Sequence, residues 1–111
     1  MAGKRRVEQD RLAASDLREH VRYLAQSSRA AALRFVAALE HSFKQLADNP
    51  GLGAVWEFER PEIADVRVWP TRGFRNYLIF YRASDESVRI MRAIHGAQDI
   101  EALFREEPEP S

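Results

Sequence analysis

The chain has 111 residues, which is enough for one compact domain and too few for two independent hydrophobic cores. Hydrophobic residues make up 45% of the chain and charged residues 31%, proportions that are typical of a folded domain and exclude an intrinsically disordered chain. The formal net charge is zero, and the lack of cysteine excludes disulfides, thiolate metal sites and cysteine nucleophiles.

Neither a membrane span nor a secretory signal is predicted. No apolar stretch approaches the roughly 18 residues that a membrane span needs. The basic start MAGKRRVEQD lacks the apolar run of a signal peptide. We therefore expect a cytoplasmic protein that does not contact a membrane.

Charge is segregated along the chain although the total is zero. Residues 66–98 contain six arginines against two carboxylates, whereas residues 99–111 contain five carboxylates against one arginine. Opposite charges attract over several ångströms. The acidic end could therefore screen the basic segment.

Two helices are predicted in the first half of the chain. Leu17, Val21 and Leu24 follow i, i+4, i+7 spacing, which predicts an amphipathic helix over about 11–26 with Asp10 as its N-cap. Ser27 or Ser28 then caps a second helix, whose apolar residues keep helical spacing for four turns: Ala32, Phe35, Val36, Leu39, Phe43 and Leu46. The Asn-Pro-Gly sequence at 49–51 ends this helix. The short break between the helices predicts an antiparallel hairpin.

Three strands are predicted after the hairpin, over 66–69, 77–81 and 88–94. Residues 70–73 and 84–87 have turn composition, so an antiparallel meander is the simplest connection. The middle strand is apolar on both faces, which predicts a central strand that is covered on both sides. The hairpin covers one face, and the other needs a short helix over 99–104 or a second protein. We expect the chain alone to expose an apolar and basic face.

The expected fold class is α+β, with an N-terminal helical hairpin packed on a three- to four-stranded antiparallel sheet and a short C-terminal helix. A polar edge strand over residues 5–8 would complete the sheet. Residues 1–105 form the single predicted domain, and residues 106–111 form an acidic tail that we expect to be disordered.

The stretches GFRNYLIFYR (73–82) and IMRAIHGAQDI (90–100) resemble the last strands of the RelE/ParE toxin superfamily, especially its ParE-like branch. The segments Ala13-x-x-Asp16-Leu17 and Phe43-x-x-Leu46-x-x-Asn49-Pro50-x-x-Gly53 are similar to the family's two helices and the turn after them. These pieces cover about residues 10–104 in the family's order and spacing. The sequence departs from the family at its polar first strand and at Gln98, where many relatives have arginine.

The resemblance implies the toxin of a type II toxin–antitoxin system, with a sheet packed on a helical hairpin. A cognate antitoxin would wrap the toxin with a helix and an extended segment, giving a hetero-oligomer. ParE-like members poison DNA gyrase, and RelE-like members cut mRNA on the ribosome. We favour the gyrase-directed function without chemistry. The alternatives are a metal-independent, ribosome-dependent endoribonuclease, or a degenerate family member that is kept only as a binding or structural protein.

If the chain is a ribonuclease, four residues are candidates for its catalytic set: Arg75, Tyr81, Arg92 and His95. His95 could act as a general acid or base, although a strand-end histidine bonded to the backbone is the favoured interpretation. Arg92 is in phase with apolar strand residues, which predicts burial and pairing with a carboxylate such as Asp99. Tyr81 is predicted to be a core residue. The strand segment contains no lysine, so the nuclease set looks incomplete.

Binding residues are predicted for two partners. The candidates for target binding are Arg67, Trp69, Arg72 and Arg75, because arginine forks suit phosphate and carboxylate. The candidates for antitoxin binding are Leu24, Phe35 and Trp56, and for both tryptophans core packing is an equal alternative. The three histidines, His20, His41 and His95, form no metal motif, and no nucleotide-binding loop is present, so we expect no metal and no cofactor.

Overall fold

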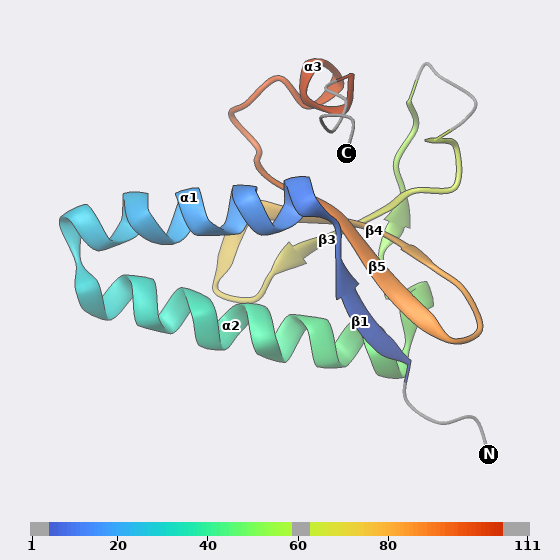
Figure 1. The fold of residues 1–111 in the computed structure, drawn as a ribbon, viewed down its shortest axis with the longest axis horizontal. Helices are drawn as coiled ribbons and strands as arrows, with labels where there is room; N and C mark the ends of the chain where they lie inside the picture. Colours follow the sequence, from blue (N-terminus) through green and yellow to red (C-terminus); the bar gives the residue numbers. More distant parts are fainter. Residues whose placement is uncertain (1–4, 59–62, 106–111) are drawn as a thin grey trace.

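The computed structural model describes residues 5–58 and 63–105 and has an α+β fold (Figure 1). The elements in chain order are β1 (Arg6–Gln9), α1 (Arg11–Ser27), α2 (Arg29–Asp48), the 3-10 helix η1 (Pro50–Leu52), β2 (Ala54–Val55), β3 (Arg67–Thr71), β4 (Phe74–Ala83), β5 (Ser87–His95) and α3 (Ile100–Phe104). The predicted fold class is confirmed. The acidic tail predicted over 106–111 lies outside the described residues. Within the described ranges, no helix is long and apolar enough to cross a membrane.

The two long helices form the predicted antiparallel hairpin, and Figure 1 shows them running side by side. Ser28 separates them, and its Oγ accepts a hydrogen bond of 3.0 Å from the Ala31 N–H. This bond satisfies one of the free donors at the start of α2. Asp10 occupies the N-cap position of α1 as predicted, but its side chain makes no capping hydrogen bond. Its carboxylate instead pairs with Arg89 of β5 at 2.9 Å.

The strands form one five-stranded sheet in the order β1-β5-β4-β3-β2, with β4 at the centre as predicted. The meander of β3, β4 and β5 is antiparallel, also as predicted. The polar edge strand expected over residues 5–8 is present as β1, and it pairs in parallel with β5, so the sheet is mixed and has more strands than the three to four predicted. Pro70 lies inside β3 opposite Leu78, and not in the turn. The register shifts directly after it, and β2 pairs only with Arg67 and Val68, so Pro70 lies beyond β2 where a residue without an N–H is tolerated.

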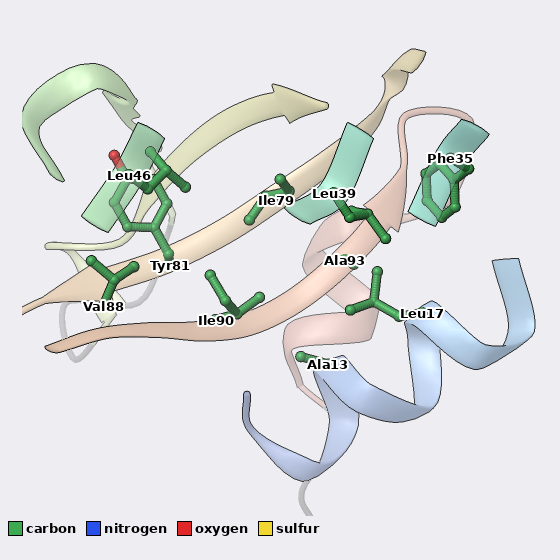
Figure 2. Close-up of a cluster of buried hydrophobic side chains, with 10 residues drawn as sticks. All are labelled: Ala13, Leu17, Phe35, Leu39, Leu46, Ile79, Tyr81, Val88, Ile90 and Ala93. Carbon is green, nitrogen blue, oxygen red and sulfur yellow. The ribbon is translucent and has the colours of Figure 1, made fainter. Parts of the chain in front are cut away.

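The core on the hairpin side of the sheet is formed by α1, α2, β4 and β5 (Figure 2). Successive side chains of a strand point to opposite faces, so Ile79 and Tyr81 face the hairpin while Phe80 faces away. The fully or nearly fully buried members of this core are Ala13, Leu17, Phe35, Leu39, Leu46, Ile79, Tyr81, Val88, Ile90 and Ala93.

The second face of the sheet has a core of its own. Phe80 is 0% exposed and Ile94 is 1% exposed. Phe104 of α3 packs on Phe80 with ring centroids 5.1 Å apart, and Trp56 packs on the same ring at 5.4 Å. The expectation that the chain alone leaves an apolar sheet face open is therefore wrong. A short helix and the segment after β2 supply the missing cover.

Candidate functional site

The turn between β3 and β4 brings three of the four predicted target-binding residues together. Trp69, Arg72 and Arg75 line a cavity of about 320 Å³ with Gln45, Pro70 and Gly73. Arg72 and Arg75 are exposed, and Trp69 is half-buried. We call this set of six residues the arginine turn. Its lining contains two guanidinium groups and no carboxylate, so it suits an anionic group on a partner.

Local contacts with α2 hold the arginine turn in place. The Arg72 N–H donates to Ser42 Oγ at 3.3 Å, and Arg72 Nη1 donates to His41 Nε2 at 3.0 Å. The turn reverses direction at Gly73, whose φ of +77° is disfavoured for residues with a Cβ. Both the backbone and one guanidinium of the turn are therefore fixed before any partner binds.

Arg67, the fourth target-binding candidate, lies at the other end of β3. Its Nη1 donates to the Gly53 carbonyl at 2.6 Å, in a partly buried position. It is opposite Tyr81 in the sheet. The structure therefore separates Arg67 from the arginine turn and gives it a contact inside the molecule.

Arg92 is a structural link between three elements. It is 5% exposed, and it donates from Nε and Nη2 to the Asp16 carboxylate at 2.8 and 2.9 Å. Nη1 donates to the Leu103 carbonyl at 2.5 Å, which joins α1 and β5 to α3. The predicted burial and carboxylate pairing are confirmed, but the partner is Asp16 and not Asp99. Asp99 instead caps α3 by accepting from the Ala102 N–H at 3.1 Å.

The predicted common phase of the apolar residues around Arg92 is wrong. Val88 and Ile90 face the hairpin, whereas Ile94 belongs to the core on the opposite face. The register between β4 and β5 shifts after Phe80, which faces Arg92. Such an irregularity breaks strict alternation along a strand. Sequence periodicity cannot reveal it.

Tyr81 is fully buried, and its hydroxyl is used within the fold. The hydroxyl donates to the Pro50 carbonyl at 2.6 Å and accepts from the Gly53 N–H at 2.9 Å. Burial raises the pKa of Tyr81, and the Gly53 hydrogen bond and the Arg67 charge offset part of the increase. These contacts agree with the prediction of a core residue.

His95 is half-buried at the end of β5, and its bonds are local. Its Nδ1 accepts from the Ala97 N–H at 3.0 Å, and its backbone N–H donates to Gln98 Oε1 at 2.8 Å. The favoured interpretation of a strand-end histidine bonded to backbone is confirmed. Of the four nuclease candidates, Arg92 and Tyr81 are buried and engaged in hydrogen bonds within the fold, while Arg75 lies in the arginine turn.

A second surface lies along the helical hairpin and was missed by sequence reasoning. A groove of about 510 Å³ has an apolar floor and two arginines, and we call it the hairpin groove. Its lining residues are Gln9, Ala14, Leu17, Arg18, Val21, Arg22, Val36 and Leu39. Val36 is 37% exposed, although its helical spacing predicted a core residue. In the sequence, arginines next to apolar helix positions could have indicated this groove. The same pattern is equally typical of a helix face exposed to solvent.

The antitoxin-binding candidates lie apart from this groove. Phe35 is 0% exposed and packs against Phe74 with ring centroids 5.2 Å apart, so a partner cannot reach it in this conformation. Leu24 is half-buried against the same core, and Trp56 covers Phe80 on the far face of the sheet. In residues 5–58 and 63–105, no three histidine or carboxylate side chains are grouped so as to hold a metal ion.

Comparisons with known proteins agree with this architecture. A family described as the ParE toxin of the type II toxin–antitoxin system parDE matches residues 7–100. A solved chain from the chromosomal ParDE system of P. aeruginosa is similar in fold, with a TM-score of 0.64 and 22% identity. The alignment covers 83% of this chain and 96% of that chain. No curated protein matches. Since the family match spans most of the sequence, the chain belongs to the ParE toxin family of type II toxin–antitoxin systems.

Proposed function

We propose that this toxin acts by binding DNA gyrase through the arginine turn, without chemistry of its own. The main support for this proposal is that the nuclease candidates do not surround one common site. Arg92 and Tyr81 are committed to internal bonds, and His95 is bonded to its own loop. A general acid–base mechanism needs its groups within hydrogen-bond reach of one reacting centre. In contrast, the arginine turn is preorganised and open to a partner.

The hairpin groove is the proposed seat of the cognate antitoxin. Its floor is apolar, and Arg18 and Arg22 stand at positions one turn apart on α1. An amphipathic segment with acidic residues beside its apolar stripe would complement both features. The groove shares no lining residue with the arginine turn, so antitoxin and target would contact different parts of the toxin.

Replacing His95 by Gln separates a binding mechanism from a nuclease mechanism. A binding toxin transfers no proton, so the folded variant should still arrest growth and inhibit supercoiling by purified gyrase. General acid–base help is worth on the order of 100- to 10,000-fold in rate. A folded variant that has lost toxicity, with ribosome-dependent mRNA cleavage by the parent, would establish the ribonuclease alternative.

The arginine turn itself is tested by the double variant Arg72→Ala, Arg75→Ala. We expect the concentration needed for half-inhibition of gyrase to rise at least about tenfold, because the charge pair is removed from the contact. The control is Arg29→Ala with Arg34→Ala, which removes the same charge from exposed positions of α2. Equal effects of the two double variants would mean that only net charge matters and would refute a local contact.

A further inference from the structure

A third pocket, of about 320 Å³, shares no lining residue with the arginine turn or the hairpin groove. It lies where α1 passes the start of β4 and the end of β5. The lining residues are Glu19, His20, Tyr23, Tyr77, His95 and Gln98. Neither the toxin–antitoxin contact nor the gyrase contact proposed above uses this set.

Aromatic rings form the walls of this pocket. Tyr77 contacts two imidazoles edge-to-face, with its centroid 4.9 Å from that of His20 and 4.9 Å from that of His95. Tyr23 is 67% exposed and lies at the rim. Burial, and next the neighbouring Tyr23, raises the pKa of Tyr77 above its ordinary value of 10.0.

Hydrogen bonds within the protein determine which polar atoms of the pocket lining remain available to a ligand. His95 Nδ1 accepts from the Ala97 N–H, so the neutral ring carries its proton on Nε2. Gln98 Oε1 accepts from the His95 backbone N–H, which leaves the amide NH₂ as a donor. The Glu19 carboxylate is an acceptor. His20 Nε2 donates to the Ala93 carbonyl at 2.7 Å, which leaves Nδ1 of the neutral ring as an acceptor. The pocket therefore combines two donors, one charged and one neutral acceptor, and two phenols.

The charge of the lining and the volume of the pocket indicate which class of ligand it can bind. The lining contains no arginine or lysine, so a phosphate is not the group that is recognised. The volume lies at the lower end of small-molecule pockets, which suits a single ring system. Proteins hold unstacked bases with aromatic side chains against the ring and polar groups on its edge.

We infer that this pocket binds one unstacked nucleobase, with Tyr23 and Tyr77 against the ring and Glu19, His95 and Gln98 at its edge. The base could come from a free nucleotide or from a single-stranded nucleic acid. The inference does not depend on gyrase as the target. Its failure would leave the proposed function unchanged.

Titration of the ¹⁵N-labelled full chain tests the pocket. The probes are the four nucleoside monophosphates, a short single-stranded oligonucleotide, ribose 5-phosphate and N-acetyltyrosinamide. We expect saturable shifts at His95 and Gln98 with base-containing probes only. Tighter binding of the oligonucleotide would assign the base to a nucleic acid, and equal binding would assign it to a free nucleotide. Shifts with ribose 5-phosphate of the same size, binding of N-acetyltyrosinamide alone, or no shift at all would overturn the inference.

Two exposed lining residues provide variants that leave the core intact. Tyr23→Ala should weaken nucleotide binding at least about fivefold, the lower end for a lost base–aromatic contact. Glu19→Gln should weaken binding as well, because it replaces a charged acceptor by a neutral amide. The control is Val55→Ala in β2, a side chain that is 50% exposed and outside the pocket. Unchanged binding by both pocket variants would place the nucleotide elsewhere and would refute the assignment.

Discussion

Single buried polar side chains connect the layers of this toxin. Arg92 is nearly inaccessible, and its forked guanidinium matches the Asp16 carboxylate in a two-point contact. Burying such a pair costs desolvation, and removing one partner would leave the other charge unpaired inside the protein. The same guanidinium reaches the backbone of α3. Arg92, one of the four nuclease candidates, therefore supports the fold.

Tyr81 gives a residue-scale prediction that depends on pH. Tyr81→Phe leaves the Pro50 carbonyl and the Gly53 N–H without their partner, which should lower the free energy of unfolding by about 1–3 kcal/mol at pH 7. Folding raises the pKa of Tyr81, so its neutral form is favoured in the folded state. That stability is fully present below the unfolded pKa of about 10 and is lost as the pH rises further.

Urea unfolding followed by tryptophan fluorescence at pH 8 to 10.5 measures this effect. The parent should lose stability over the upper part of this range, and Tyr81→Phe should lose less. The decline should persist in part, because burial also raises the pKa of Tyr77. Parallel curves for the two proteins would contradict the assignment.

At the scale of elements, the turn between β3 and β4 shows how a short connection becomes a binding surface. Pro70 extends β3 and the register shifts after it, which shortens the turn to Arg72 and Gly73. Ser42 of α2 is fully buried, and its hydroxyl accepts from the Arg72 backbone. The helix therefore positions Arg72 relative to Trp69.

Gly73→Ala tests the geometry of this turn without removing a side chain. Nothing lies within 4 Å of a Cβ built at Gly73, so the expected cost is backbone strain at positive φ, about 1 kcal/mol. Thermal unfolding should show a Tm lower by a few degrees. Gly51→Ala is the matched control, because its Cβ would make only an ordinary contact of 3.7 Å and its φ is not positive. A loss of stability in the control alone would refute the role of φ.

At the scale of the whole molecule, the chain covers both faces of its sheet. Large exposed apolar side chains lie on the helical hairpin and on the short strand β2. Tyr23, Leu33 and Val36 of the hairpin and Val55 of β2 are each at least 37% exposed. Exposed apolar groups beside arginines favour association with an amphipathic partner. We therefore expect the antitoxin at the outer surface of the hairpin and not on an open sheet face.

Val36→Lys should weaken binding of the antitoxin by about fivefold or more, because it places a charge on the apolar floor of the hairpin groove. Val55→Lys makes the same change at an exposed valine outside the groove and should have little effect. Titration calorimetry with the purified antitoxin would compare them. A larger loss for Val55→Lys would place the antitoxin at the β2 edge of the sheet.

The sequence alone determined the elements with strong periodicity or clear turn chemistry. These are the helical hairpin, the three meander strands and the central place of β4, because local spacing decides which face of an element is apolar. The same stretches carried the resemblance to the ParE family. The burial of Tyr81 was predicted for the same reason.

Only the tertiary structure decided how distant parts meet. The partner of Arg92 is 76 residues away in the sequence, and no local pattern distinguishes Asp16 from Asp99. The parallel strand β1, the two-residue β2 and the cover of Phe80 by α3 each depend on contacts across the fold. The hairpin groove and the arginine turn are likewise formed by residues from separate elements. Periodicity reports which side of one element is apolar, whereas a site depends on which elements become neighbours.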